Sequence, residues 1–113
     1  MDKLRHISMS VPDVEAAAKF YQDTFGLECV RTTETSVWLS DGTINFVLTP
    51  TSNFDGTDME GFVGIDHFGF VAEDKDGTTK KVLDNGGRAA DGKCWDPNGT
   101  MVNVNDKYWL GSK

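Results

Sequence analysis

The feature that most constrains this sequence is a weak internal repeat that relates its first half to its second. When the sequence is shifted by 61 positions, HISMSVPDVEAAAKFYQDTFGLE aligns with HFGFVAEDKDGTTKKVLDNGGRA. The identical pairs are His6/His67, Asp13/Asp74, Lys19/Lys80, Asp23/Asp84 and Gly26/Gly87. In both copies the histidine lies near the start of a strand, the first aspartate precedes a helix and the glycine follows it. Because similarity at a fixed period marks a repeated structural unit, the sequence predicts two copies of one module.

Each copy is expected to open with a strand and to continue into a helix. In the first copy, apolar residues alternate over 4–11 and then recur at helical spacing over 14–25. Asp13 is a predicted N-cap, and Gly26 can adopt the left-handed conformation that ends a helix. In the second copy, Asp74 and the Gly86-Gly87 pair mark the corresponding boundaries around a weaker apolar stripe.

Further strands are predicted after each helix. In the first copy they cover 28–32, 36–39 and 43–49, with an Asp41-Gly42 hairpin turn between the last two. In the second copy a turn at 96–99 leads to a closing strand at 100–105, and the shorter spacing predicts that one middle strand is stunted. The predicted organisation is a single domain, with module one at 1–50, a polar, glycine-rich linker at 51–64 and module two at 65–113.

Length and charge limit the classes of partner. A chain of 113 residues is long enough for one compact domain with a buried core. The formal net charge of −7, with scattered cations, argues against a nucleic-acid-binding surface. No segment has the roughly 18 consecutive apolar residues that a membrane span requires, and the N-terminal residues lack a secretory signal pattern. We therefore expect a cytoplasmic protein in which Cys29 and Cys94 are reduced.

The segment RHISMSVPDVEAAAKFYQDTFGLE and the ending DPNGTMVNV resemble the vicinal oxygen chelate superfamily. This superfamily includes glyoxalase I, methylmalonyl-CoA epimerase, extradiol dioxygenases, and bleomycin and fosfomycin resistance proteins. The resemblance covers nearly the whole chain and rests on the paired histidines, the FYxxxFG helix and the DPxG turn. It implies an α+β fold in which two tandem βαβββ modules form a cupped, partly open mixed β-sheet barrel around a central cavity.

The resemblance also implies a metal site with ligands from the first and last strands of each module. His6 and His67 match the two first-strand positions, and Phe46 and Asn103 match the last-strand positions, which are usually carboxylates. An amide oxygen can ligate a hard cation, whereas a phenyl ring cannot. The implied ligands are therefore His6, His67 and Asn103, for a divalent ion such as Zn, Ni, Mn, Co or Fe.

This ligand set lacks a carboxylate, and with it the usual general base of related enzymes. Asp58, Glu60 and Asp66 are the acidic residues that could approach the site. We discount Asp66, because side chains alternate along a strand and Asp66 should point to the face opposite His67. No catalytic residue is assigned.

Three aromatic residues are predicted to bind the substrate. Phe46, at a former ligand position, is expected to face inward beside the histidines and to favour an apolar or aromatic ligand. Trp38 and Tyr108 are expected to line the same wall. The other strand aromatics are expected in the core or in a dimer contact.

Two functions from different classes fit these residues. The first is a metal-assisted lyase or isomerase that acts on a substrate with neighbouring oxygens through an enolate-type intermediate. The second is a metal-free protein of the bleomycin-resistance kind, which binds a small aromatic molecule or antibiotic and keeps the histidines as polar pocket walls. An oxygen-using iron enzyme is disfavoured, because its two-histidine, one-carboxylate triad is incomplete.

The resemblance finally implies a homodimer, either side by side or with modules exchanged between chains. The short strands of a cupped sheet leave edges that need cover, which agrees with self-association. The apolar Trp109-Leu110 pair is expected to contribute to the contact.

Overall fold

The structure, a computed structural model, describes residues 1–51 and 61–113. Its elements in chain order are β1 (Lys3–Val11), α1 (Val14–Phe25), β2 (Glu28–Thr32), β3 (Val37–Ser40), β4 (Asn45–Pro50), β5 (Gly64–Val71), α2 (Lys75–Asp84), β6 (Arg88–Ala90), β7 (Lys93–Trp95) and β8 (Met101–Asn105). Each half thus follows the predicted order of strand, helix and three strands. Positions 52–60 of the predicted linker lie outside the described residues.

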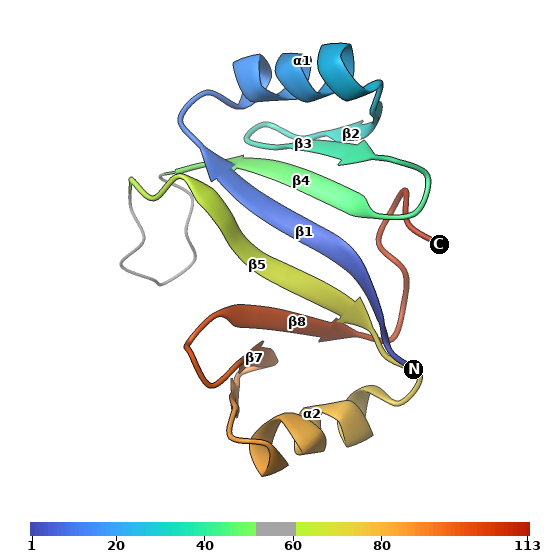
Figure 1. The fold of residues 1–113 in the computed structure, drawn as a ribbon, viewed down its shortest axis with the longest axis vertical. Coiled ribbons are helices and arrows are strands. Elements are labelled where there is room, and N and C mark those ends of the chain that lie inside the picture. The colour runs from blue at the N-terminus through green and yellow to red at the C-terminus, as the bar shows by residue number, and fades with distance from the viewer. Residues whose placement is uncertain (52–60) are drawn as a thin grey trace.

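All the strands form one mixed sheet in the order β2-β3-β4-β1-β5-β8-β7-β6 (Figure 1). Within each module the first and last strands are parallel, β1 with β4 and β5 with β8. The antiparallel pair of β1 and β5 joins the two modules at the centre. Because the two end strands, β2 and β6, do not pair with each other, the sheet is open. The predicted α+β fold of two βαβββ modules is confirmed.

Both helices begin at the predicted aspartate caps. The Asp13 carboxylate accepts from the backbone N–H of Ala16, and the Asp74 carboxylate accepts from that of Gly77. Gly26 has a φ of 72°, the left-handed conformation that ends α1. In the described part of the chain, neither helix is long and apolar enough to cross a membrane.

The two modules differ in how many of their apolar side chains are buried. In the first, α1 packs on the sheet over a core of buried residues: Val11, Ala18, Val37, Leu39 and Leu48. In the second, α2 has no buried residue, and β6 and β7 are only three residues long. The prediction of one stunted strand was therefore too conservative, because both middle strands are short.

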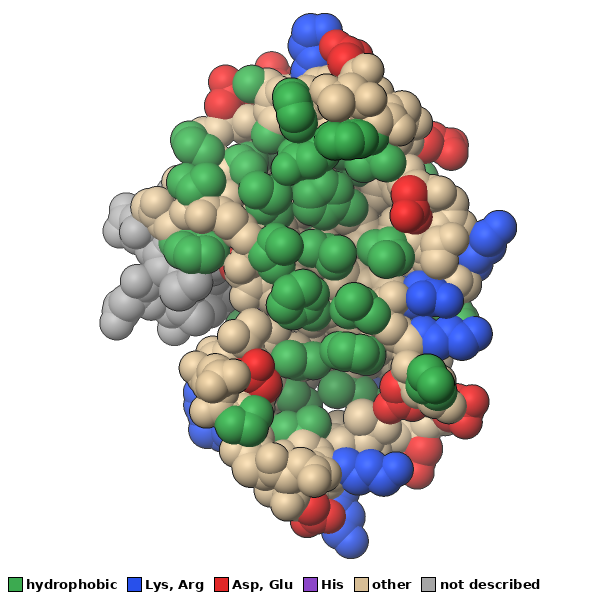
Figure 2. All heavy atoms as spheres, viewed as in Figure 1, with side chains coloured by type: hydrophobic (Ala, Val, Ile, Leu, Met, Phe, Trp, Pro, Cys, Tyr) green, Lys and Arg blue, Asp and Glu red, His purple; other side chains and the backbone are tan. Residues whose placement is uncertain are grey.

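A continuous row of apolar side chains crosses the sheet between the two helices. Ile7 pairs with Phe46 and Phe68, and Phe68 pairs with Val102, so these residues share one face. Met9 and Phe70 lie two residues further along on the same face. We call these six residues the apolar face. Figure 2 shows apolar side chains between α1 and α2 and no histidine on this side.

Candidate functional site

The pairing of β1 with β5 brings the two histidines together on the other side of the sheet. Ser8 lies opposite His67 and His6 lies opposite Gly69, so the four residues share one face, called here the histidine face. The Nε2 atoms of His6 and His67 are 3.1 Å apart, and the ring centroids are 5.1 Å apart. The two histidines at matching repeat positions thus lie side by side, and their role as metal ligands stays a prediction.

His6 is the more buried histidine, with only 6% of its surface exposed. Its Nδ1 lies 2.6 Å from Asn45 Oδ1, and Asn45 Nδ2 donates to the backbone oxygen of Leu110 at 2.9 Å. Because that oxygen can only accept, the second bond fixes the amide orientation and makes His6 Nδ1 the donor. Burial lowers the pKa of His6 to about 4, although the Asn45 hydrogen bond acts in the opposite direction. At neutral pH His6 is therefore uncharged, and its Nε2 carries a lone pair.

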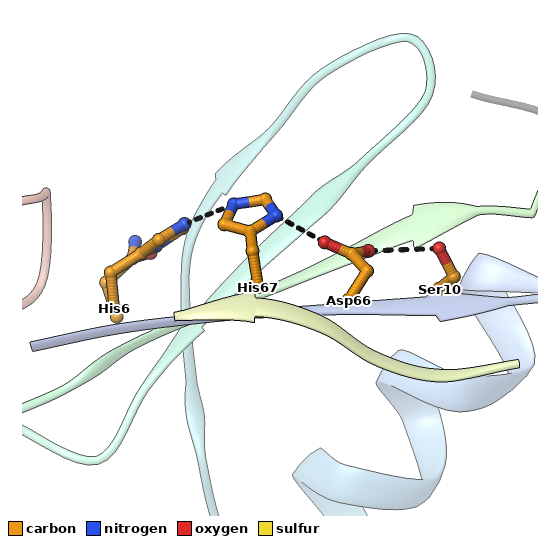
Figure 3. Close-up of polar contacts among 5 residues, drawn as sticks. His6, Ser10, Asp66 and His67 are labelled. Atoms are coloured by element: carbon orange, nitrogen blue, oxygen red, sulfur yellow. Dashed lines mark hydrogen bonds and ion pairs between the residues drawn. The ribbon is translucent and has the colours of Figure 1, made fainter. Parts of the chain in front are cut away.

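Asp66 holds His67 from the neighbouring position in β5. One carboxylate oxygen contacts His67 Nδ1, and the other accepts from Ser10 Oγ at 3.0 Å (Figure 3). The β1–β5 register shifts between Ser8 and Met9, which makes Asp66 an extra residue in β5 without a partner. Such a bulge breaks the alternation of side chains. The expectation that Asp66 points away from His67 is therefore wrong.

The two Nε2 atoms face each other, and an oxygen atom lies behind each ring. Each Nδ1 faces an oxygen acceptor, from Asn45 for His6 and from Asp66 for His67. The lone pair on His6 Nε2 faces His67 Nε2 across 3.1 Å. This arrangement resembles a metal site, because metal-bound imidazoles commonly donate their other N–H to a carboxylate or carbonyl oxygen.

Trp109 covers His6 from the segment that follows β8. The indole and imidazole rings stack with centroids 4.7 Å apart and planes 8° apart. Beneath the indole lies Gly69, where an added Cβ would sit 2.6 Å from Trp109 and 2.8 Å from the His6 Cβ. Gly69 is therefore required for space. Trp109 therefore lies inside the site, and its expected role in a dimer contact stays a prediction.

The structure separates the two residues expected to complete the ring of ligands. Asn103 lies opposite Gly69 in the parallel β5–β8 pair and so shares the histidine face. The Phe46 ring packs edge-on against the Tyr21 ring of α1, with ring centroids 5.1 Å apart, on the side of the apolar face. Asn45 pairs with His6 and occupies the position expected for Phe46. The expected position of Phe46 is therefore wrong by one residue.

The other two predicted substrate residues lie further from the histidines. Trp38 pairs with Val47 and shares the histidine face, but its strand is separated from β1 by β4. Its ring lies beneath the Arg31 guanidinium at 5.0 Å. Tyr108 is 46% exposed in the segment after β8. Substrate binding by Trp38 and Tyr108 stays a prediction.

The cavity nearest to α2 does not include the histidines. It measures about 320 Å³ and is lined by residues of α2, β6, β7 and β8, among them Lys75, Cys94 and Val104. In the described ranges, no three His, Cys, Asp or Glu side chains converge as a metal site. Asp58 and Glu60 lie outside the described residues. The site is thus a histidine pair with oxygen acceptors behind both rings.

The sequence matches a family model over residues 3–107, described as the glyoxalase/bleomycin resistance protein/dioxygenase superfamily. The chain belongs to this superfamily. The vicinal oxygen chelate resemblance is thereby confirmed, and the superfamily contains enzymes that bind small molecules, often with divalent metals. No curated protein matches the sequence.

Solved structures of low sequence identity share the fold. A hypothetical protein from Bacillus halodurans C-125 matches with a TM-score of 0.71 and 16% identity, covering 96% of both chains. A methylmalonyl-CoA epimerase in complex with methylmalonyl-CoA and NH4+ matches with a TM-score of 0.68 and 17% identity, covering 92% of this chain and 93% of the other. A mutant 4-hydroxymandelate synthase from Streptomyces coelicolor gives a TM-score of 0.74 at 15% identity, covering 91% of this chain and 36% of the other. At these identities the likeness shows the fold alone.

Proposed function

We propose that this protein is a metal-assisted lyase or isomerase acting on a small molecule with two neighbouring oxygens. The observation that carries the proposal is the convergence of His6 Nε2 and His67 Nε2 at 3.1 Å. Two metal–nitrogen bonds of ~2.1 Å, at an angle of roughly 90–109°, would hold their nitrogens about 3.0–3.4 Å apart. The observed distance falls in this range.

The donor set fits a borderline divalent ion. Imidazole nitrogens suit Zn, Ni, Co and Fe, and Mn accepts them when oxygen ligands complete the set. Asn103 shares the histidine face and is proposed as the third ligand, through its amide oxygen. When bound, such an ion would supply positive charge beside the substrate oxygens as an enolate forms.

The chain's own residues would hold and orient this site. The Asp66 carboxylate keeps the His67 ring turned toward His6, and the Asn45 amide does the same for the His6 ring. Trp38 and Tyr108 are proposed as substrate contacts at the edges of the histidine face. Phe46 is not part of the proposal, since it packs behind the sheet against α1.

Metal titration by calorimetry tests the proposal. Wild type is expected to bind one Zn²⁺ or Ni²⁺ per chain, while His6→Ala and His67→Ala each abolish binding, because one imidazole and an amide hold a divalent ion poorly in water. Cys29→Ser is the matched control, since it removes an exposed thiol that could bind the same metals. Equal binding by wild type and both histidine variants would refute the proposal.

A metal-free binding protein is the second candidate. It is favoured because, among the described residues, no third His, Cys, Asp or Glu side chain joins the two histidines in a group that could hold a metal ion. A wild-type protein that retains no metal and binds none in titration, yet shows saturable binding of a planar aromatic compound, would establish this alternative.

A homodimer is also part of the proposal, with the apolar face as its contact. At ~4.8 Å between strands and ~6.6 Å between side chains along a strand, the six residues of this face cover roughly 190 Å² of the sheet. Ring contacts from Phe46 to Tyr21 and on to Phe25, which is 63% exposed, continue the face over α1. A contiguous apolar patch of this kind commonly marks an interface, and a twofold dimer uses the same patch on both copies. The net charge of −7 disfavours an anionic membrane surface as the occupant.

Sedimentation equilibrium distinguishes this contact from the one first expected at Trp109-Leu110. Wild type is expected to sediment as a dimer at micromolar concentration, and Phe68→Lys as a monomer with native circular dichroism. Leu110→Ser, at a residue that is 51% exposed, should leave the dimer intact. A monomeric wild type, or dissociation by Leu110→Ser alone, would overturn the assignment.

A cytoplasmic location completes the proposal. Cys29 and Cys94 are both free thiols, which a reducing compartment would preserve. Labelling of intact cells with membrane-impermeant and permeant thiol reagents tests it, and only the permeant reagent should react with the protein.

A further inference from the structure

The segment that follows β8 turns back across the histidine face. The backbone oxygens of Leu110 and Gly111 accept from Asn45 Nδ2 at 2.9 Å and Ser40 Oγ at 2.6 Å. Lys113 N donates to the backbone oxygen of Thr43 at 3.1 Å. In Figure 1 this last part of the chain runs beside the turn between β3 and β4. The segment is thus fastened to the first module, although it emerges from the second.

This attachment reaches His6 by two routes. One is the Asn45 amide, whose orientation depends on its bond to Leu110 and which in turn fixes the hydrogen on His6 Nδ1. The other is Trp109, which stacks on the imidazole. The indole fits there because Gly69 has no side chain. Without the segment, the Asn45 amide could flip, and the His6 ring would lose contact on one side.

We propose that Trp109 is a positioning residue of the histidine pair, and that the segment 109–113 acts with it to hold the His6 ring and its tautomer. The geometry carries this proposal. The indole stacks in parallel on the imidazole, and the space beside Gly69 is too small for even one added carbon atom. Only the metal readout described below rests on the proposed function. Trp109 orients His6, and the ring itself would contact the metal.

Nuclear magnetic resonance of the histidine rings tests the proposal without metal. The chain has two histidines, so each spectrum holds two ring systems, assigned with His67→Gln. In wild type, the His6 ring protons are expected to be shifted upfield by the indole, and its ¹⁵N signals to report Nδ1–H alone. Trp109→Ala should abolish the upfield shift and give a mixture of tautomers, while Trp109→Phe should restore the single tautomer with a smaller shift.

The second readout is Zn²⁺ affinity. Loss of groups that orient a ligand commonly costs about 10–100-fold in metal affinity. We expect at least a tenfold loss in Trp109→Ala and in Gly69→Ala, which pushes the indole off His6, and less than about threefold in Trp109→Phe. Leu110→Ala is the matched control in the same segment, because its backbone oxygen still holds Asn45.

The outcomes separate this inference from the proposed function. If wild type binds no Zn²⁺, the function fails and the ring spectra still decide the inference. An unchanged His6 tautomer in both Trp109→Ala and Gly69→Ala would overturn it, since removal of the indole changes the ring shift in any case. If Trp109→Ala does not fold, Gly69→Ala and Trp109→Phe decide between the same two results.

Discussion

Lowering the pH from 7 to 4 is expected to destabilise this fold through His6. Burial lowers the pKa of His6 from 6.5 to about 4. Between these two pH values the imidazole is protonated in the unfolded chain and neutral in the folded chain. The stabilisation is therefore complete above pH 6.5 and is lost progressively as the pH falls toward 4. The titratable groups that act on His6 are His67, whose Nε2 lies 3.1 Å away, and Asp66, which contacts the other nitrogen of the His67 ring.

The size of the effect follows from the shift in pKa. A difference of 2.5 units, from 6.5 to about 4, corresponds to roughly 3 kcal/mol at ~1.4 kcal/mol per unit. Since domains of this size have unfolding free energies of about 5–15 kcal/mol, a loss of that size is a large share of the total.

Urea unfolding at pH 7, 6, 5 and 4.5 measures this loss. Carboxylates also contribute to acid destabilisation, so the informative quantity is the difference between wild type and His6→Gln, which keeps a polar side chain that cannot titrate. The variant should lose about 2–3 kcal/mol less than wild type over this range. Parallel pH profiles for the two proteins would show that His6 is already protonated or freely solvated in the fold, and would refute the reasoning.

Three further predictions concern the site and the core. Asn103→Glu is expected to raise Zn²⁺ affinity at least tenfold in calorimetry, because it adds a charged oxygen on the histidine face, and unchanged affinity would remove position 103 from the ligand set. Asp66→Asn is expected to weaken Zn²⁺ binding about 10-fold or more by removing the charge behind His67, whereas Ser10→Ala should have a smaller effect, and the reverse order would contradict the assigned contact. Leu48→Ala, at a side chain with 0% exposure, should lower the free energy of unfolding by about 2–5 kcal/mol in urea titration, and a loss under about 1 kcal/mol would mean that this core is not tightly packed.

The elements that sequence patterns predicted well are those determined locally. Asp13 and Gly26 fix the ends of α1 through short-range hydrogen bonds and backbone conformation, and the repeat then implies the corresponding second helix. The position of the histidines also followed, since both lie on first strands whose place in the repeat is the same. Local signals were sufficient for these features.

The errors arose where pairing between distant segments decides the outcome. Phe46 and Asn45 are adjacent, and only the register with β1 determines which of them faces His6. The available signal was Asn45 itself, an amide side chain between Ile44 and Phe46 in the predicted strand 43–49. The bulge at Asp66 depends likewise on how β5 pairs with β1, and alternation alone cannot reveal it.

Trp109 was missed for a related reason. Its position over His6 requires the chain to return from the second module to the first, a contact that neither periodicity nor capping predicts. The signal in the sequence was Gly69, a glycine inside a strand, which often marks a close approach of another group.

The unequal packing of the two modules has a consequence for how the molecule fluctuates. Regions with few buried apolar contacts open at a lower free-energy cost than the global unfolding transition. Amide protons of α2, β6 and β7 should therefore exchange with solvent long before those of β1 and β4, which lie beside the α1 core. The histidine pair joins the two modules, because His6 lies in β1 and His67 in β5. His6 thus belongs to the module whose amides are expected to exchange slowly. A protein built this way can rearrange one half around a ligand while the other half keeps its structure.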